Sequence, residues 1–595
     1  MPEAFDFVIV GAGSAGCVLA GRLTEDPDVR VLLLEAGPPD DADEVRIPAA
    51  FYRNFKTARD WHYTTAEQKQ LHGRRLYWPR GRMLGGCSSL NAMIYVRGHR
   101  LDFDRWRDDH GATGWGYADL LPYFRRAEDQ ARGASPYHGV GGPLRVEDLR
   151  SVHEVTRAFL DSAVEAGLTP NDDFNGPVQD GVGLYQVTQR RGRRWSAADA
   201  YLRPALGRPN LTVRTDALAT RVTVHNGRAT GVAYTWRGAE TVAHAGREVV
   251  LAGGAVNSPQ LLLLSGIGPA SHLRDVGVDV LVDLPGVGGN LSDHPFVPVM
   301  WRTRGIADLH DAETPVQMAR WFATRRGPLT SNGAESGAFL RSRPDLPAPD
   351  LQLHVLGTMS IEHGLVRPPG RGLTIGPALV DVRSRGRVTL RSADPRWKPA
   401  IDAGYYTDPA DLDAMVAGVR IAREIAARGP LARAIVEPWL PGPGQDGDDA
   451  VREAVRAATQ TLYHPVGTCS MGVGPDSVVD PELRVRGVDG LRVVDASVMP
   501  AVPRGNTNAP TIALAERAAD LVAGRRPLVP YAPAPVAVGA APGSPGGASG
   551  SPGAASGSSD GAPGSPASPP SVPAGTDTDP PETASGPPVP AGGTR

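Results

Sequence analysis

Residues 5–37 read FDFVIVGAGSAGCVLAGRLTEDPDVRVLLLEAG, and this stretch decides the fold. An apolar run rich in β-forming residues (5–10) leads into three glycines, an amphipathic helical pattern and a second apolar run that ends at Glu35. A strand, a glycine-rich turn, a helix and a strand in this order form the dinucleotide-binding unit of Rossmann-like folds. The sequence therefore predicts an α/β domain with a cofactor at its first strand-to-helix turn.

The three glycines of this stretch have separate steric roles. Gly11 permits the tight turn, Gly13 lets a phosphate approach the backbone, and Gly16 lets the helix pack closely on the strand. The helix directs its unpaired N–H groups and its partial positive charge at the same point. We therefore expect the pyrophosphate of a dinucleotide to lie against this loop, from Gly11 and Gly13 through Ser14 and Ala15 to Gly16.

Glu35 favours a cofactor without a phosphate group on its ribose. It ends the second strand about 20 residues after the last glycine of the turn, where a carboxylate accepts hydrogen bonds from ribose hydroxyl groups. The same carboxylate repels a 2′-phosphate, so NADP is disfavoured. FAD and NAD both remain open at this point.

The composition describes a large globular protein without a nucleic-acid or membrane signature. The chain has 595 residues, 41% of them hydrophobic, and a formal net charge of −3 with acidic and basic residues interspersed. The most apolar window, 249–267, is interrupted by polar residues, so we expect no integral membrane segment. The N-terminus lacks the pattern of a secretory leader, and three widely spaced cysteines fit a reducing compartment. We expect a cytoplasmic protein that binds neither nucleic acid nor a metal ion.

Later segments indicate a second domain and a tail. Residues 210–236 alternate apolar and polar side chains around an Asn-Gly turn, which predicts an antiparallel meander. Residues 295–461 mix strand-like runs with a helical run at 411–427, which predicts an α+β domain. From about residue 529 the chain is mostly Pro, Ala, Gly and Ser, so we predict a disordered tail that serves either as a dispensable end or as a tether.

Two further motifs make the sequence similar to the glucose-methanol-choline (GMC) family of flavin oxidoreductases. Residues 81–91 (GRMLGGCSSLN) resemble the first family signature, and residues 254–268 (GAVNSPQLLLLSGIG) resemble the second. Shorter agreements are LPGVGGNLSDH at 284–294, HPVGTCSMG at 464–472 and NTNAPTIALAERAADLV at 506–522. The resemblance runs from residue 5 to about residue 524 and is strongest to choline dehydrogenases and other primary-alcohol dehydrogenases.

The resemblance implies FAD as the cofactor, held without a covalent bond by a discontinuous domain. Some family members attach the flavin through a histidine just before the Asn of the first signature, and that position is Leu90 here. The implied substrate domain is an antiparallel sheet backed by helices over the flavin ring. The expected segments are 1–160 and 161–294 (FAD-binding domain, the second part with the meander), 295–461 (substrate-binding domain), 462–528 (return segment of the FAD-binding domain) and 529–595 (tail).

The resemblance also implies individual cofactor contacts. We expect the isoalloxazine ring to lie near Gly85, Gly86 and Asn91. Val222 is expected to hold the adenine through its backbone. Asp495 and Ala496 are expected to close around the ribityl chain and the phosphates.

Oxidation of an alcohol by hydride transfer needs a group that takes the hydroxyl proton, and imidazole suits this role near neutral pH. His464 precedes Pro465, which favours an extended backbone, and its HPVGT context matches the catalytic histidine of the family. The family places a second His or Asn opposite it, and that position is Asn506. Asn508 is the rival; we expect it to cap the last helix and to lie near the flavin.

The sequence thus predicts FAD-dependent oxidation of a primary alcohol, choline or another small alcohol, to the aldehyde. His464 would abstract the proton, and the carbon would transfer its hydride to flavin N5. The electron acceptor, whether a quinone, a redox protein or O₂, stays open, and with it the choice between dehydrogenase and oxidase. The alternative from another class is a non-redox flavoprotein, a lyase or a decarboxylase, on the same fold.

Overall fold

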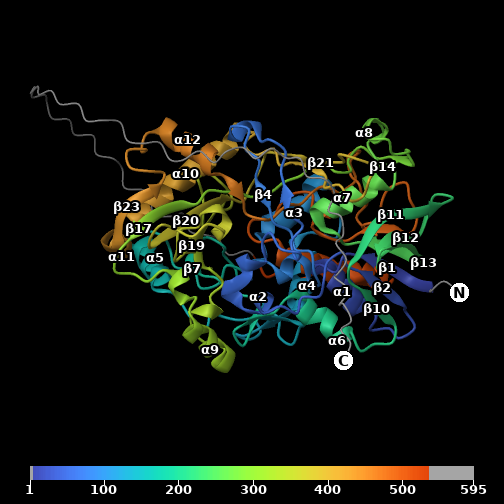
Figure 1. The fold of residues 1–595 in the computed structure, drawn as a ribbon, viewed down its shortest axis with the longest axis horizontal. Helices are drawn as coiled ribbons and strands as arrows, with labels where there is room; N and C mark the ends of the chain where they lie inside the picture. The colour runs from blue at the N-terminus through green and yellow to red at the C-terminus, as the bar shows by residue number, and fades with distance from the viewer. Residues whose placement is uncertain (1–3, 535–595) are drawn as a thin grey trace, which may run out of the picture. The chain divides into compact units, whose positions relative to one another are not determined.

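The computed structural model describes residues 4–534 and arranges them around two β-sheets (Figure 1). From position 535 onward, the predicted tail (529–595) lies outside the described residues. The predicted fold class is confirmed, because a Rossmann-like sheet built from distant segments is joined to an antiparallel α+β part.

The first sheet has a parallel core made from three distant parts of the chain. β1 (Ala4–Val10) lies between β2 (Val31–Leu34) and β13 (Ala239–Leu251). β10 (Leu211–Arg214) extends the sheet beside β2, and β25 (Leu491–Val493) pairs with β13. All four residues of β2 are buried, as expected for a strand covered on both faces.

The predicted meander is attached to the same sheet. β11 (Ala217–His225) and β12 (Arg228–Trp236) form an antiparallel hairpin, and β12 pairs with the first half of β13. The second half of β13 pairs in parallel with β1, so this one long strand joins the meander to the nucleotide-binding core.

Two helices hold the return segment against the first sheet. α1 (Ser14–Leu23), which follows the glycine-rich turn, packs on the last helix, α13 (Asn508–Val522). The buried carboxylate of Glu516 on α13 accepts hydrogen bonds from Arg22 Nη2 at 2.9 Å and from Arg126 Nε at 2.7 Å. Two cations thus compensate one buried anion, which fixes α13 beside α1.

The second sheet is antiparallel and covered by helices, including α5 (Glu154–Glu165) and α10 (Pro409–Ala426). Within residues 4–534, six of its eight strands are, in spatial order, β23 (Ile435–Leu440), β17 (Val299–Thr303), β20 (Gly372–Leu379), β19 (Leu351–Leu356), β18 (Ala334–Leu340) and β7 (Gly181–Leu184). The other two, β16 (Pro295–Phe296) and β24 (Gln460–Thr461), pair with each other, and β16 also pairs with β20. The position of β7 in the second sheet differs from our expectation, because we assigned residues 161–294 to the FAD-binding domain. Its Gly-rich, four-residue sequence carries no alternation that would have placed it in this sheet.

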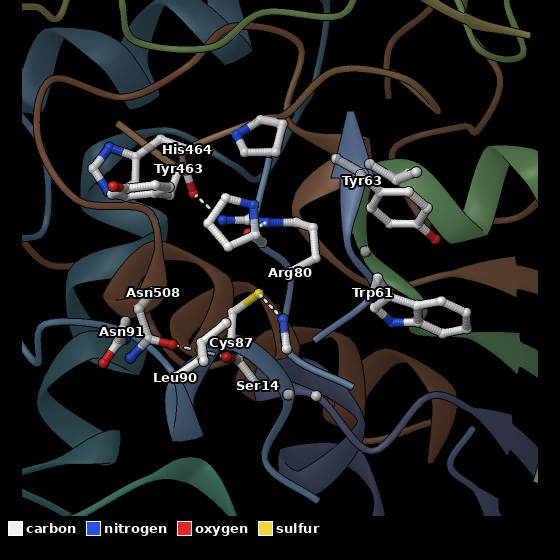
Figure 2. Close-up of a pocket in the computed structure, with 18 of the residues that line it drawn as sticks. Ser14, Trp61, Tyr63, Arg80, Cys87, Leu90, Asn91, Tyr463, His464 and Asn508 are labelled. Atoms are coloured by element: carbon white, nitrogen blue, oxygen red, sulfur yellow. Dashed lines mark hydrogen bonds between the residues drawn. The ribbon is translucent and has the colours of Figure 1, made fainter. Parts of the chain in front are cut away.

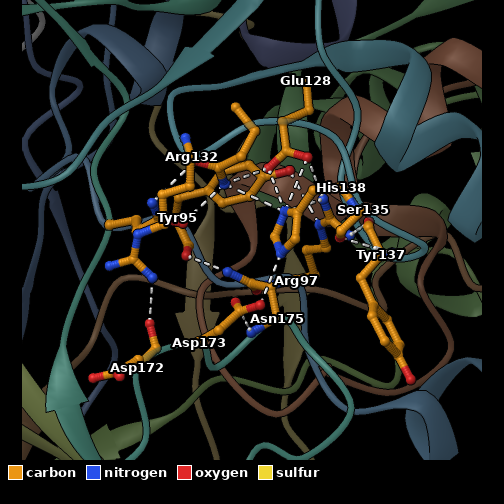
Figure 3. A network of polar contacts seen from close by, with 12 residues as sticks. Tyr95, Arg97, Glu128, Arg132, Ser135, Tyr137, His138, Asp172, Asp173 and Asn175 are labelled. Carbon is orange, nitrogen blue, oxygen red and sulfur yellow. Dashed lines mark hydrogen bonds and ion pairs between the residues drawn. The ribbon is translucent and has the colours of Figure 1, made fainter.

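A buried polar network ties together three segments that all follow the first GMC-like motif in sequence, at 95–97, 128–138 and 172–175 (Figure 3). His138 contacts Glu128 through Nδ1 at 3.0 Å and Asp173 through Nε2 at 2.9 Å, and Arg97 Nη2 donates to Glu128 at 2.7 Å. Burial disfavours the charged imidazole, but the hydrogen bonds to Asp173 and Glu128 outweigh it and raise the pKa of His138. The protonated ring is therefore part of the folded structure.

Replacing His138 with Leu should destabilise the protein in a pH-dependent way. Because the folded pKa lies above the ordinary 6.5, the stabilisation is complete below pH 6.5 and is lost as the pH rises through the raised pKa. We expect a loss of about 2 kcal/mol near pH 6 and a smaller loss near pH 9, measured by thermal unfolding. His72→Leu, which removes an exposed histidine paired with Glu453, is the control and should change little at either pH. Equal losses at both pH values would refute the charged network.

Candidate active site

One continuous cavity of about 390 Å³ joins the glycine-rich turn to the segment that holds His464. At one end it is lined by Gly11 and Glu35, which directly follow β1 and β2. This is the carboxyl edge of the parallel strands, where open α/β sheets bind their ligands. Figure 2 shows the region between the two ends, with His464 above a hydrogen-bonded pair formed by Ser14 and Asn508.

Most of the residues predicted from the sequence meet at this cavity. Those that line it are Gly11, Gly13, Ser14, Ala15, Glu35, Gly86, Asn91, His464, Asp495, Ala496, Asn506 and Asn508. Gly16, Gly85 and Val222 do not line it. Gly85 lies directly behind the wall, where its N–H donates to the carbonyl of Ala12 at 2.7 Å.

The structure does not bring Val222, which we expected to hold the adenine through its backbone, to the wall of this cavity. Its side chain is buried, and its amide donates to Ser265 Oγ at 2.9 Å rather than into the cavity. The cavity touches β11 only at its first residues, Ala217–Ala219. Ala219 is instead the β11 residue whose backbone could contact an adenine. No motif around Ala219 predicted this position.

The glycine-rich turn has the shape that a dinucleotide needs. Gly11 has φ +100°, and a Cβ there would lie 2.5 Å from the carbonyl oxygen of Ala252. A Cβ at Gly16 would lie 1.9 Å from the carbonyl oxygen of Gly11, so this glycine permits the close packing of α1. Gly13 has open space in front of it, since the nearest atom to its Cβ would be 3.9 Å away. The cavity therefore reaches the backbone of the turn at Gly13, as a pyrophosphate requires.

Glu35 is held in place by the same turn. Its two carboxylate oxygens accept hydrogen bonds from the amides of Ala12 and Gly37, each at 2.9 Å. Burial raises the pKa of Glu35 to about 7, although these two amides oppose the rise. A carboxylate fixed at the edge of the cavity can accept further hydrogen bonds from ribose hydroxyl groups.

Asn91 and Asp495 are likewise oriented by their neighbours. The amide oxygen of Asn91 accepts from Arg194 Nη1 at 2.9 Å and from the amide of Met93 at 3.0 Å, so its amide nitrogen is the free donor. Asp495 accepts from the amide of Gly254 at 2.8 Å and from Ser258 Oγ at 2.6 Å. Asp495 thereby joins the return segment to the start of α7 (Gly254–Leu264), the second GMC-like motif.

His464 lies at the far end of the cavity and is fixed from three sides. Its backbone amide donates to Asp293 Oδ1 at 2.7 Å. Its Nδ1 lies 3.0 Å from Nδ1 of His294, and its Nε2 lies 3.3 Å from Nδ2 of Asn506. The structure thus brings Asn506 to His464, in the position that we predicted for the second catalytic group.

A chain of hydrogen bonds sets the orientation of the Asn506 amide. The hydroxyl of Tyr185 donates to the carbonyl of Leu353 at 2.7 Å, so it must accept from Gln352 Nε2, which is 3.0 Å away. The same nitrogen of Gln352 donates to Oδ1 of Asn506 at 3.5 Å. The Nδ2 of Asn506 therefore points at His464.

This orientation assigns the proton of the His464 ring. Because Asn506 donates to Nε2, that nitrogen carries the lone pair, and Nδ1 carries the proton and donates to His294. Burial, with the nearby His294, His354 and Arg80, holds the pKa of His464 well below its ordinary value. His464 is therefore a neutral imidazole whose basic nitrogen lies at the cavity wall.

Asn508 differs from our expectation that it caps the last helix. It is the first residue of α13, and its Oδ1 accepts from Ser14 Oγ at 2.7 Å. The side chain thus bonds the glycine-rich turn and cannot bend back to the amides of its own helix. Thr507 occupies the cap position without a side-chain cap bond.

Sequence reasoning missed three residues of this site: Asp293, His294 and Gln352. Asp293 and His294 belong to the quoted motif LPGVGGNLSDH, to which we gave no role. Gln352 belongs to no motif that we identified. It is a buried residue of β19. Its alternation with apolar neighbours was the one available signal.

Two family models and several known proteins match the chain. The models of the GMC oxidoreductase family match residues 5–296 and 382–515. An alcohol dehydrogenase [acceptor] of Pseudomonas putida is 44% identical over 528 residues, 87% of this chain and 95% of that protein. The mitochondrial choline dehydrogenase of Homo sapiens is 44% identical over 537 residues, 88% of this chain and 90% of that protein. The structure of Aspergillus oryzae formate oxidase, solved to study its FAD modification, has a TM-score of 0.82 and 30% identity, and covers 88% and 98% of the two chains.

The chain belongs to the GMC oxidoreductase family, and its cofactor is FAD. The glycine-rich turn, Glu35 and the oriented amide of Asn91 are the groups that would hold it. Among residues 4–534, no helix has both the length and the apolar character needed to cross a bilayer.

The flavin should leave the protein when the protein is denatured. Leu90, the position at which some members of the family carry a linking histidine, is buried and has no nucleophilic atom. After precipitation with acid, we expect the yellow chromophore in the supernatant, measured by absorbance. A chromophore that stays with the precipitated protein would contradict a non-covalent cofactor.

Proposed function

We propose that the protein oxidises an uncharged primary alcohol with an apolar chain to the aldehyde. The observation that carries this proposal is the pairing of His464 Nε2 with Asn506 Nδ2 at the wall of the cofactor cavity. One group can accept a proton and the other can donate a hydrogen bond, and both face the same space. An alcohol oxygen placed between them would meet both requirements of its oxidation.

The residues act on the alcohol as follows. When bound, the flavin supplies a two-electron acceptor that can take the hydride of the carbinol carbon. His464 Nε2 takes the hydroxyl proton, which raises the electron density on the oxygen. The amide of Asn506 donates to that oxygen and stabilises the charge that develops on it. Asp293 holds the backbone of His464, so the ring keeps its position as it gains a proton.

The cavity favours an uncharged substrate over a trimethylammonium alcohol. Its wall includes Phe296, Leu356 and Leu462, and it also includes Arg80, whose guanidinium donates to the carbonyl of Tyr463 next to His464. Of the carboxylates that line it, Glu35 and Asp495 lie along the nucleotide part.

Glu313, the carboxylate of the outer part, is engaged by Tyr52 and by Arg53 at 2.6 Å. A cation near the basic nitrogen would thus meet a positive group and no free carboxylate, and only aromatic rings of the wall such as Phe296 and Tyr463 would attract it. The relative named alcohol dehydrogenase [acceptor] supports an alcohol as the substrate, and the equally identical relative named choline dehydrogenase makes choline the alternative to test.

An anaerobic panel of alcohols tests the proposal. Holoenzyme is mixed with primary alkanols of increasing length, with benzyl alcohol and with choline, and bleaching of the flavin absorbance is recorded. We expect the uncharged alcohols to reduce the flavin, and choline to do so with at least about tenfold lower kcat/KM. The repulsion between the choline cation and Arg80 should cost about 1.4 kcal/mol or more, which corresponds to this factor. Choline as the preferred substrate would overturn the substrate class, and no bleaching by any alcohol would overturn the activity.

His464→Ala should abolish the proton transfer while FAD stays bound. We expect flavin reduction to slow by at least ~10²-fold, because general-base catalysis contributes on this scale. The control is His363→Ala, which removes another histidine of the cavity wall that contacts Tyr463 instead of Asn506. Stopped-flow absorbance measures both. A normal reduction rate in His464→Ala would refute the role of this residue.

His294 should act as the positioning residue for the His464 tautomer. In His294→Asn an amide oxygen can replace Nδ1 as acceptor, whereas His294→Leu leaves the proton of His464 Nδ1 without a partner. We expect His294→Leu to lower kcat by about 10-fold or more with little change in KM, and His294→Asn to restore most of it. Equal losses in both variants would indicate a packing role only.

A further inference from the structure

Helix α9 (Pro315–Thr324) has two apolar faces. One faces the protein, because Trp321 is 1% exposed and its indole N–H donates to the carbonyl of Gly192 at 3.0 Å. Met318 lies against the same cluster. The outward side of the helix carries a stripe of exposed apolar residues, the α9 stripe, which consists of Pro315, Val316, Ala319, Phe322 and Ala323.

The α9 stripe is continuous. Its members recur three and four residues apart, so they share one side of the helix. Val316 is 74% exposed and Phe322 is 47% exposed. Single exposed apolar residues are ordinary, but a whole exposed apolar helix face indicates an interaction surface. Trp321 anchors α9, and Phe322 at the edge of the stripe packs edge to face on its ring, with the ring centres 5.2 Å apart.

Arginines lie beside the α9 stripe. Arg320 and Arg326 are exposed, and Arg325 lies with its guanidinium 3.8 Å from the centre of the Trp321 ring. None of the three forms an ion pair with an acidic residue within the part of the chain that the structure describes. Arg46 and Arg193 add positive charge near Arg325, where Asp43 is the acidic neighbour. The rim of the stripe is therefore basic.

The α9 stripe lies beside the outer end of the cofactor cavity. Leu309, His310 and Glu313, just before α9, line this cavity, and so does Leu329, just after it. The side chain of Glu313 is 30% exposed, so the cavity reaches the surface here. In Figure 1, α9 projects from the lower edge of the part of the chain that carries the second sheet.

We propose that the α9 stripe docks on the surface of an anionic lipid bilayer. A short helix with an apolar face and flanking arginines inserts that face at the boundary of headgroups and acyl chains, and the arginines contact the anionic headgroups. One helix face of five side chains offers far less area than a stable protein–protein interface needs, which favours lipid over a protein partner or a second copy of this chain. When the α9 stripe is docked, the outer end of the cofactor cavity would face the bilayer.

The docking proposal goes beyond the proposed activity and does not depend on the identity of the substrate. Its test is sedimentation of the full-length holoenzyme with vesicles. One set of vesicles contains phosphatidylglycerol and phosphatidylcholine, and the other contains phosphatidylcholine alone. We expect binding to the anionic vesicles that weakens as the salt concentration rises.

Two variants and a control make the test specific. Val316→Asp/Phe322→Asp should weaken vesicle binding by roughly 10-fold or more, since both side chains lose their apolar burial. Arg320→Glu/Arg326→Glu should weaken it by a similar factor through charge. Val473→Asp, at a valine that is 65% exposed outside α9, should bind as the wild type does. All variants should bind FAD and unfold at the same temperature as the wild type, measured by flavin absorbance and thermal unfolding, which shows that they fold.

Three outcomes would overturn the proposal. These are no binding to anionic vesicles, binding that Val316→Asp/Phe322→Asp leaves unchanged, and a dimer in solution that the same variant converts to a monomer. The last outcome would assign the α9 stripe to a second copy of the chain. Because vesicle binding is measured without turnover, a failure of the proposed activity leaves its result valid.

Discussion

The site depends on the return of the chain to the first sheet after the second sheet is complete. β25 adds to β13, and the buried carboxylate of Asp495, just after β25, accepts hydrogen bonds from Gly254 and Ser258 of α7. Burial raises the pKa of Asp495, although these donors oppose the rise. A second bond joins Asn508 to Ser14 of the glycine-rich turn. These contacts fix the return segment on the part of the cavity that receives the nucleotide.

This arrangement also positions the reactive groups. His464 and Asn506 flank β25 in sequence, so the contacts that seat β25 and α13 also place these two side chains. The chain from Tyr185 through Gln352 then connects the second sheet to Asn506. The Asn506 amide is thus one of the points at which the cofactor part and the substrate part meet.

Local sequence was sufficient to predict the nucleotide-binding core and most of the site. The glycines and Glu35 act through backbone geometry within one βαβ unit, and that geometry is encoded locally. His464 and Asn506 could be found because motif context identified them.

The errors concern contacts between distant segments. Ala219 lines the cavity and Val222 does not, because the cavity reaches only the first residues of β11. The side chain of Asn508 bonds Ser14, which is 494 positions away. β7 joins the second sheet by pairing with β18, and Gln352 acts through a strand of the same sheet. No local pattern determines such tertiary partners.

The central claim is that His464 and Asn506 act on an alcohol whose carbinol C–H bond breaks as the flavin is reduced. The most direct measurement is the rate of anaerobic flavin reduction by a primary alkanol, compared with the same alkanol deuterated at the carbinol carbon. We expect slower reduction with the deuterated alcohol, at the same end absorbance of a fully bleached flavin. Reduction at equal rates, or a flavin that stays yellow with both alcohols, would contradict it.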